Sequence, residues 1–403
     1  MDIRTLLAPS ALAVGAGTPT DQGVPWAPPA QAASPITLGG GIPDPETLPV
    51  QQLHSALTAV LLDAPADTLR YGGVLGFEGL RQVLAERYTN IDGLPLSIDN
   101  FIMTNGGAGG IANVCEAFLE PGDVVLVEAP TFSGSLRTFR GQMADVLSVP
   151  VDGDGIVVDE VSRRLDEAEA NGKRVKLVYT VADYHNPTGV TMSAERRRAL
   201  IDVCAEHSVL ILEDAAYSEI SFGEKAPSLY GLGGGYGVLR VSTFSKPIAT
   251  GLRVGWVQAT EEIVDALSKV RFDMGISPVL LRMLADYVGS GQMDAHLEHM
   301  RPIYAAKVDA LCRSLDEHCS EFVRYSKPEG GFFLWVECVG ASALDVTREA
   351  AELGLMFAAG SNFFVNGESD DTSHVRLAFS TASIEELGEV GPRMREAFVR
   401  ARR

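Results

Sequence analysis

The residues most clearly suited to catalysis lie around Lys246, in the segment 242–247 (STFSKP). The hydroxyls of Thr243 and Ser245 precede this lysine, and Arg253 follows in a glycine-containing stretch. A lysine amine forms a Schiff base with an aldehyde, and hydroxyl and guanidinium groups bind a phosphate dianion. The segment therefore suits a cofactor that carries both an aldehyde and a phosphate. Taken alone, it is equally compatible with a surface lysine in a serine-rich loop.

A second candidate is the carboxylate of Asp214, which follows the apolar run 209–212. A carboxylate at the end of a buried strand needs a cationic partner. A protonated pyridine nitrogen would provide that partner, and the charge would make the ring an electron sink. The alternative role for Asp214 is a helix N-cap, which is common for aspartate.

Two turn-like segments add further polar groups. The segment 184–189 (YHNPTG) favours a turn, and the Asn186 amide there can donate to a phenolate oxygen. The segment 105–110 (NGGAGG) precedes the helical run 111–119, whose first backbone N–H groups would form an anion site. This segment lacks the Gly-x-Gly-x-x-Gly spacing of a dinucleotide fingerprint, which disfavours a nicotinamide enzyme.

Taken together, these segments resemble, in order and context, the fold-type I pyridoxal-5′-phosphate (PLP) enzymes, and specifically the class I/II aminotransferases. The subgroup that the chain resembles contains the α-aminoadipate/kynurenine aminotransferases and the aminotransferase domains of MocR-type regulators. The resemblance extends from about residue 37 to the C-terminus. It implies an α/β fold with a large domain, built on a mainly parallel seven-stranded sheet between helices, and a smaller α+β C-terminal domain. It also implies PLP as cofactor and a homodimer with shared active sites.

The resemblance assigns catalysis to Lys246, Asp214 and Tyr217. Lys246 would carry the cofactor as a Schiff base, Asp214 would pair with the pyridine nitrogen, and Tyr217 would hydrogen-bond the phenolic oxygen. The implied cofactor-binding residues are Gly107, Ala108, Phe132, Asn186, Asp214, Tyr217, Thr243, Ser245, Lys246, Arg253 and Tyr71. The implied substrate-binding residues are Arg376, Asn186 and Gly40.

Four of these assignments carry a specific expectation. Phe132 would stack on the cofactor ring, and Tyr71 would reach the phosphate in the neighbouring subunit. Arg376 would clamp the α-carboxylate of the substrate, a bidentate task to which a guanidinium is suited. Gly40 would approach the substrate through its backbone.

The chain departs from the family pattern at three places. Gly107 and Ala108 stand where relatives usually have a side-chain donor, so phosphate binding there must rest on backbone N–H groups. Phe132 replaces a common tyrosine, which removes a hydroxyl but keeps the stacking face. His185 replaces a glutamine, and we interpret it as a packed, hydrogen-bonded histidine. A role in substrate selection is the alternative.

The expected reaction is ping-pong transamination, in which an L-amino acid gives its amino group to the cofactor and a 2-oxo acid then receives it. The freed Lys246 amine would move the proton as general base and then acid. The same fold also hosts elimination, decarboxylation and cyclisation. A non-catalytic ligand sensor is a further alternative. The sequence leaves the substrate side chain open.

The elements that must position these residues alternate between strands and helices. The short apolar runs 124–127, 175–179, 209–212 and 238–241 are typical of strands. The stretches 194–207 and 261–269 between and after them are typical of amphipathic helices. Such alternation predicts a parallel α/β sheet covered on both faces, with ligands at the carboxyl ends of its strands.

Changes in amino-acid composition and in the predicted elements along the chain indicate three parts. Residues 1–35 are rich in Ala, Pro and Gly, and we predict a flexible N-terminal arm. Residues 36–290 are expected to form the large PLP-binding domain, with 36–60 partly shared with the small domain. Residues 291–403 are expected to form the small domain.

The bulk composition restricts the partners. A net charge of −20 argues against nucleic acid or an anionic membrane, because both attract clusters of Lys and Arg. No apolar run is long enough to span a bilayer. The five cysteines have no metal-site or redox spacing, so we expect no metal, buried free thiols and a reducing cytoplasm. The expected partners are therefore amino acid and 2-oxo acid substrates and a second copy of the chain.

Overall fold

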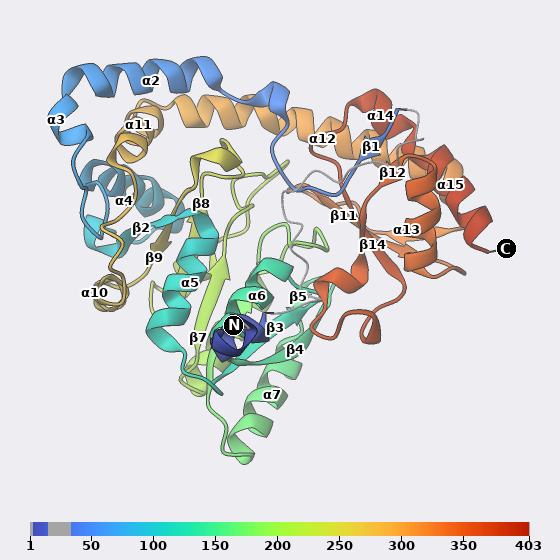
Figure 1. Cartoon of the computed structure of the whole chain (residues 1–403), viewed down its shortest axis with the longest axis horizontal. Coiled ribbons are helices and arrows are strands. Elements are labelled where there is room, and N and C mark those ends of the chain that lie inside the picture. The colour runs from blue at the N-terminus through green and yellow to red at the C-terminus, as the bar shows by residue number, and fades with distance from the viewer. Residues whose placement is uncertain (1–2, 15–33, 403) are drawn as a thin grey trace.

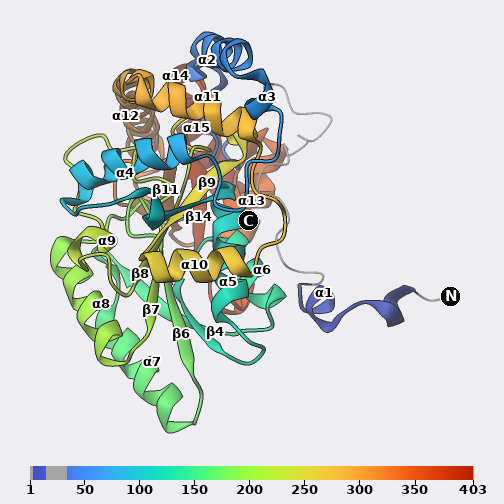
Figure 2. The ribbon, with the colours of Figure 1, turned by 90° about the vertical axis from the view of Figure 1, so that its left-hand side faces the viewer.

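The computed structural model describes residues 3–14 and 34–402 of the 403-residue chain (Figure 1). The predicted arm of residues 1–35 therefore lies largely outside the described residues. The described part of that arm forms a short 3-10 helix, Ile3–Leu6, and helix α1, Pro9–Ala13. Helix α1 lies against helix α6, Ser133–Gly141, at the side of the molecule (Figure 2).

A large, mainly parallel sheet forms the centre of the molecule. Its strands are β2 Phe101–Asn105, β3 Val124–Ala129, β4 Asp145–Asp152, β5 Gly155–Ile156, β6 Val175–Thr180, β7 Leu210–Asp214, β8 Val238–Thr243 and β9 Val254–Gln258. The strand order is β2-β9-β8-β7-β6-β3-β4, and the two-residue β5 forms a hairpin with β4 at the edge. Strands β8, β7, β6, β3 and β4 run parallel, whereas β9 is antiparallel to both of its neighbours. The predicted seven-stranded, mainly parallel sheet is thus confirmed, with β5 as a short addition.

Helices cover both faces of this sheet (Figures 1 and 2). They are α4 Glu78–Asp92, α5 Gly106–Phe118, α7 Val158–Ala170, α8 Ala194–Glu206, α9 Leu229–Leu232 and α10 Glu261–Lys269. Residues of β3 alternate between the two faces. Val125 and Val127 pack in a core cluster with α5, α6 and α10, whereas Val124 and Leu126 pack in another with α7 and α8. This double burial explains why the predicted strand runs are mainly apolar.

The C-terminal part of the chain has a second, smaller sheet. Its strands are β10 Val323–Tyr325, β11 Phe333–Cys338, β13 Ala358–Ala359 and β14 His374–Ala378, in the antiparallel order β10-β11-β14-β13. Helices α13 Ala343–Glu352, α14 Ile384–Gly388 and α15 Val390–Ala401 accompany it. The smaller α+β part predicted for the C-terminus is therefore present.

Helices α11 Pro278–Gly289 and the 28-residue α12 Gln292–Cys319 lie between the two sheets along the chain. Helix α2 Val50–Asp63 and the four-residue α3 Pro65–Thr68 precede the large sheet, and α2 packs against α11. Strand β1, Ile36–Thr37, pairs in parallel with β12, Leu355–Met356, so the start of the described main body lies beside C-terminal residues. The exact domain limits at residues 35 and 290 stay predictions.

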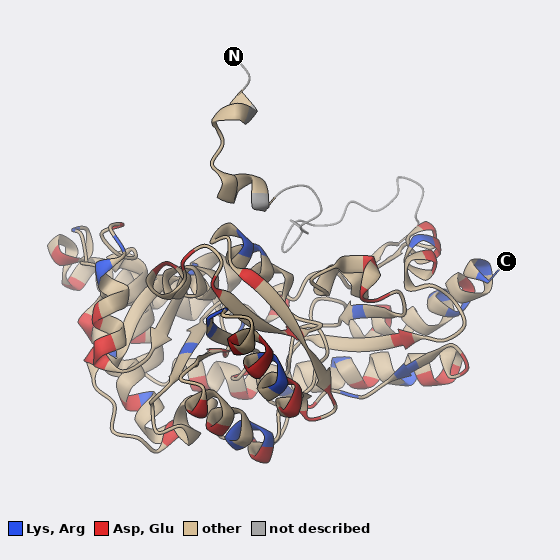
Figure 3. Cartoon of the chain, turned by 90° about the horizontal axis from the view of Figure 1, so that it is seen from below, with Lys and Arg blue, Asp and Glu red and all other residues tan. Residues whose placement is uncertain are grey.

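The cysteines and charges follow simple patterns. All five cysteines are free and buried, which confirms the predicted thiols. Acidic and basic side chains are interspersed along the same helices (Figure 3), as where Arg163 of α7 pairs with Glu160 and Glu167. Among the described residues, no helix is long and apolar enough to cross a membrane.

Candidate active site

A cavity of about 420 Å³ opens at the carboxyl ends of the parallel strands. The predicted site residues that line it are Gly40, Gly107, Ala108, Phe132, Asn186, Asp214, Tyr217, Thr243, Ser245, Lys246, Arg253 and Arg376. They come from the loop after β1, the start of α5, the loops after β3 and β6, the ends of β7 and β8 with the loops that follow them, and β14. The structure thus brings together groups spread over more than 330 residues of sequence.

Lys246 holds its amine inside this cavity. Its Nζ donates a 2.6 Å hydrogen bond to the Gly41 carbonyl and lies 5.5 Å from the centre of the Tyr217 ring. Burial lowers the pKa of Lys246 to about 8, and the positive charge of Arg376 acts in the same direction. More of this amine than of an exposed lysine is therefore neutral near neutral pH, as an attacking nucleophile must be.

Asp214, the last residue of β7, is the buried carboxylate of the site. Its Oδ2 accepts a 2.8 Å hydrogen bond from the Tyr179 hydroxyl, and its Oδ1 accepts one of 3.2 Å from the Ala216 N–H. Burial raises the pKa of Asp214, and these two donors oppose that rise. A cationic ring nitrogen placed here would supply the counter-charge that a buried carboxylate requires.

Tyr179 was missed by the sequence analysis. It lies in β6, whereas Asp214 ends the neighbouring strand β7, and their contact joins residues 35 positions apart. The available signal was a tyrosine near the end of a mostly aliphatic strand. Without the strand order, that tyrosine could not be assigned a partner.

An anion cradle is built at the start of α5. Gly106 opens this helix with φ of +65°, and a Cβ there would lie only 2.7 Å from Arg253 Nη2. Arg253 Nη1 donates to the Ser245 hydroxyl at 3.3 Å, and the Thr243 and Ser245 hydroxyls are 2.9 Å apart. Helix N–H groups, two hydroxyls and a guanidinium are the donor set that a phosphate dianion requires.

Arg376, Asn186 and the loop at Gly39 form the opposite side of the cavity. Arg376 Nη1 donates to Asn186 Oδ1 at 2.9 Å, and Nη2 donates to the Gly39 carbonyl at 2.5 Å. The guanidinium carbon lies 4.4 Å from the Phe333 ring centre and 4.5 Å from that of Phe363. The two aromatic rings hold the guanidinium plane where a carboxylate can bind to it.

The loop that carries Gly40 is tightly packed. A Cβ on Gly41 would lie 2.2 Å from Phe333 Cζ, so only glycine allows this aromatic ring to approach the loop. Gly40 lines the cavity, and a Cβ added there would have nothing within 4 Å.

Tyr71 is the one predicted site residue that the structure does not bring to the cavity of its own chain. Its side chain is 82% exposed. The loop that contains it touches the loop before α11, because a Cβ on Gly275 would lie 2.0 Å from the Gly73 carbonyl oxygen. Phe272, in that second loop, is 94% exposed. The role of Tyr71 toward a neighbouring subunit stays a prediction.

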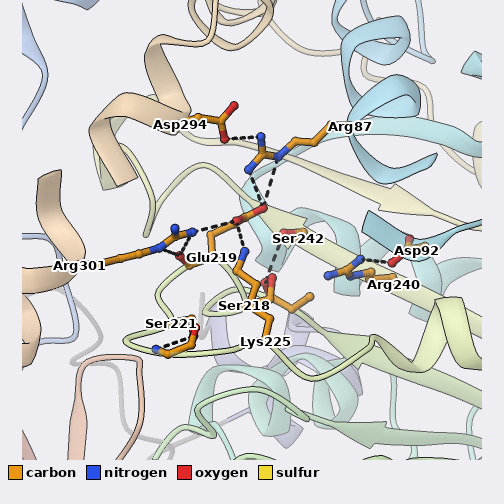
Figure 4. A network of polar contacts seen from close by, with 12 residues as sticks. Arg87, Asp92, Ser218, Glu219, Ser221, Lys225, Arg240, Ser242, Asp294 and Arg301 are labelled. Atoms are coloured by element: carbon orange, nitrogen blue, oxygen red, sulfur yellow. Dashed lines mark hydrogen bonds and ion pairs between the residues drawn. The ribbon is translucent and has the colours of Figure 1, made fainter. Parts of the chain in front are cut away.

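A buried ionic network fixes the loop that carries Tyr217 (Figure 4). Glu219 lies 3.2 Å from Arg87 of α4 and 2.5 Å from Lys225, and its backbone carbonyl accepts from Arg301 of α12. Although burial opposes it, Lys225 and Arg87 lower the pKa of Glu219 to about 2. The sequence analysis missed this network because its members lie far apart in the chain.

His185 is buried and does not line the cavity. Its Nδ1 lies 2.8 Å from the Thr188 hydroxyl. Its Nε2 lies 3.0 Å from Glu128 Oε2, a close contact whose angle falls short of a hydrogen bond. Its position accords with the packed histidine that we expected from the sequence.

The residues of the cavity fit pyridoxal phosphate. The buried amine of Lys246 suits its aldehyde, the carboxylate of Asp214 suits its ring nitrogen, and the cradle at Gly106 suits its phosphate. Phe132 adds an aromatic face in the same cavity. The fit rests on donor chemistry and on the space that the absent Cβ of Gly106 leaves.

Comparison with known proteins gives consistent results. The family model for aminotransferase class I and II matches residues 35–390. An aromatic-amino-acid aminotransferase of Thermococcus litoralis is 32% identical, over 90% of this chain and 87% of that protein. A 2-aminoadipate transaminase of Thermus thermophilus is 31% identical, over 88% of this chain and 87% of that protein.

A solved structure of similar fold extends these results to the cofactor. The kynurenine aminotransferase of Pyrococcus horikoshii, solved with PMP, superposes with a TM-score of 0.90. It is 28% identical, and the match covers 99% of this chain and 98% of that one. The predicted fold type, enzyme class and cofactor are thereby confirmed. This chain belongs to the class I and II aminotransferases and is a fold-type I enzyme that uses pyridoxal 5′-phosphate.

Proposed function

We propose that the chain moves the amino group of an L-amino acid to a 2-oxo acid by a ping-pong mechanism in which Lys246 moves the proton. When bound, pyridoxal phosphate supplies an aldehyde that combines with amines and a ring that accepts electron density from Cα. The single observation that carries the proposal is the buried Lys246 amine, with a pKa of about 8, in the same cavity as Asp214 and Arg376. An amine of that pKa can take a proton from Cα and return it to another carbon.

The remaining roles follow from the side chains around this amine. We assign Asp214 to the protonated ring nitrogen, and Asn186 and Tyr217 to the phenolic oxygen. We assign Phe132 to stacking on the ring. The phosphate would be held by the cradle residues Gly107, Ala108, Thr243, Ser245 and Arg253.

Arg376 would bind the α-carboxylate of each substrate. Its guanidinium now donates to Asn186 and to the Gly39 carbonyl, both of which line the cavity. A carboxylate accepts two parallel hydrogen bonds from such a group, and this geometry fixes the orientation of Cα. Gly40 would contact the same substrate through its backbone.

We also propose a homodimer with shared active sites, located in the cytoplasm. The loops around Tyr71 and Phe272 expose large apolar side chains next to each other, and Leu69 is a further one, 70% exposed. A second copy of the chain would cover these side chains and receive Tyr71 in its cavity. Five buried, free thiols support a reducing compartment.

The substrates are proposed as L-amino acids of the kinds named for the relatives, which include aromatic amino acids, 2-aminoadipate and kynurenine. The test is to mix the PLP-loaded protein with single amino acids, without a 2-oxo acid, and to record the visible cofactor spectrum. We expect conversion to the pyridoxamine-type spectrum together with an equal amount of the matching 2-oxo acid. Release of ammonia or carbon dioxide instead would assign elimination or decarboxylation.

A further inference from the structure

The turn that carries Asn186 is built around the preceding residue, His185. The His185 N–H donates to the Val190 carbonyl at 2.8 Å, and the His185 carbonyl accepts from the Gly189 N–H at 2.6 Å. The ring Nδ1 lies 2.8 Å from the Thr188 hydroxyl and accepts from the Thr188 N–H at 3.4 Å. His185 therefore holds this turn through its backbone and through one side of its ring.

The other side of the ring faces a buried carboxylate. Nε2 of His185 lies 3.0 Å from Oε2 of Glu128, and the two side chains are 2% and 1% exposed. Because Nδ1 accepts from the Thr188 N–H, a neutral His185 carries its ring proton on Nε2, next to this carboxylate. The contact is electrostatic, since its angle falls short of a hydrogen bond. It supplies positive charge density that a buried carboxylate requires.

Glu128 also joins two neighbouring strands at the edge where the cavity opens. It lies one residue before the end of β3, which is parallel to β6. Its Oε1 accepts from the Thr180 hydroxyl at 2.6 Å, and its Oε2 accepts from the Val181 N–H at 2.9 Å. The loop after β3 leads to Phe132 and the loop after β6 leads to Asn186, and both residues line the cavity. One carboxylate therefore fixes the strand ends from which both residues emerge.

The amide of Asn186 needs a fixed orientation. Its Oδ1 accepts from Arg376 Nη1 at 2.9 Å, so the NH2 group is the part of the amide that can donate to a second partner. Under the proposed function, on which this inference rests, that partner is the phenolic oxygen of the cofactor. A shift of the turn would weaken both contacts, because a hydrogen bond depends on its distance and its angle.

We infer that His185 and Glu128 form a buried pair of positioning residues that holds the Asn186 amide against the phenolic oxygen of the cofactor. Neither side chain of the pair lines the cavity. The pair therefore acts on the reaction through Asn186 and not by touching the substrate.

Two neutral substitutions of His185 separate the two sides of the ring. Glutamine reaches the position of Nε2 and keeps an N–H near Glu128, whereas asparagine reaches only the position of Nδ1 and loses that N–H. Since both are amides, a difference between them does not come from a change of charge. Glu128→Gln is a less specific test, because burial raises the pKa of Asp214 and the charge of Glu128 adds to that rise.

The variants are loaded with PLP and compared by two measurements. These are the pH midpoint of the bound cofactor's visible absorption and the rate of the half-reaction with one amino acid. Loss of a donor to the phenolic oxygen raises the pKa of that oxygen. We expect His185→Asn to raise the midpoint by about one pH unit and to lower the rate about tenfold, and His185→Gln to keep the rate within about threefold of the natural one.

Two further substitutions serve as control and as second test. His207 Nε2 lies 3.8 Å from Asp166 Oδ1, and His207 does not line the cavity, so His207→Asn should match the natural protein in both measurements. Thr180→Val removes a donor from the other side of the Glu128 carboxylate and should raise the midpoint as His185→Asn does. The test therefore does not depend on the folding of a single variant.

A double variant tests whether His185 acts through Asn186. Asn186→Ala should raise the midpoint by itself, and adding His185→Asn should change the midpoint and the rate no further, whereas a general loosening of the fold would add its own effect. An unshifted midpoint in His185→Asn and Thr180→Val, or a full further shift in the double variant, overturns the inference and leaves the proposed function intact. If no amino acid converts the cofactor of the natural protein, the proposed function fails, and the midpoints still decide the inference.

Discussion

The hydroxyl of Tyr179 donates to the carboxylate of Asp214 across 2.8 Å, from one parallel strand to the next. Both side chains are buried, so the hydrogen bond is made in a region of low dielectric constant. Because burial raises the pKa of Asp214, this donor helps to keep the carboxylate ionised. We therefore expect Tyr179 to act as a positioning residue for Asp214, the group proposed to pair with the ring nitrogen of the cofactor.

Replacing this tyrosine tests the relationship. We expect Tyr179→Phe to lower kcat by about tenfold or more, because a hydrogen bond to a charged group contributes about 1.5–3 kcal/mol. Cofactor content and KM should change little. The pH dependence of the bound cofactor's absorption should shift, since a less ionised Asp214 holds the ring nitrogen proton less firmly.

Tyr287→Phe is the matched control for this prediction. The buried hydroxyl of Tyr287 has no hydrogen-bond partner among the described residues. Its removal should leave kcat and the cofactor spectrum within twofold of the natural protein. If the kcat of Tyr179→Phe equals that of the natural protein, the hydrogen bond from the Ala216 N–H is by itself enough to keep Asp214 ionised.

Glu219 should contribute to stability in a pH-dependent way. Its pKa in the folded protein is about 2, against an ordinary value of 4.5, because Lys225 and Arg87 surround it. A depressed pKa stabilises the fold fully above pH 4.5, and this contribution is lost as the pH falls through about 2. The shift corresponds to about 3 kcal/mol.

We therefore expect Glu219→Gln to lower the unfolding free energy at pH 7 by up to about 3 kcal/mol. It should also flatten the pH dependence of stability between pH 4.5 and 2. Urea unfolding at several pH values measures both effects. In the control Glu160→Gln the lost ion pair with Arg163 is on the surface, where solvent screens it, so the unfolding curve should stay nearly unchanged. Equal effects of the two substitutions would contradict the anchoring role.

The amine of Lys246 should capture the cofactor with a distinctive pH profile. Only the neutral amine attacks an aldehyde, and its pKa is about 8 in place of 10.5. The rate at which the cofactor-free protein binds PLP should rise about tenfold per pH unit below pH 8 and level off above it. Stopped-flow absorbance measures this rate, and a rate that keeps rising past pH 10 would show that burial does not lower the pKa.

Substitution of the two charged neighbours should move this profile in opposite directions. Arg376 lowers the pKa of Lys246, so Arg376→Gln should shift the midpoint to higher pH. Asp214 raises it, so Asp214→Asn should shift the midpoint to lower pH. Shifts of the same sign would contradict the electrostatic explanation.

Tyr71 allows a decisive test of the shared active site. Lys246→Ala and Tyr71→Ala should each be nearly inactive as homodimers. Mixed dimers, made by coexpression with different affinity tags, would contain one site with both Lys246 and the Tyr71 of the other subunit. They should regain up to half of the natural activity. If Tyr71 acts on its own subunit, mixing restores nothing.

The sequence by itself determined the family, and with it the enzyme class and the cofactor. The lysine at 246, the carboxylate at 214 and the arginine at 376 could be recognised because each stands in a local pattern, and their order along the chain matches one family. The strand runs in β3, β6, β7 and β8 could also be predicted, because strands buried on both faces are mainly apolar.

Only the tertiary structure decided which groups touch. The Tyr179–Asp214 hydrogen bond needs the strand order, and the Arg87–Glu219 ion pair joins residues 132 positions apart. Which side chains line the cavity depends on which face of each element turns inward, and Tyr71 is exposed and does not line the cavity of its own chain. Local patterns report what a residue can do, whereas its neighbours are set by packing between segments that are distant in the chain.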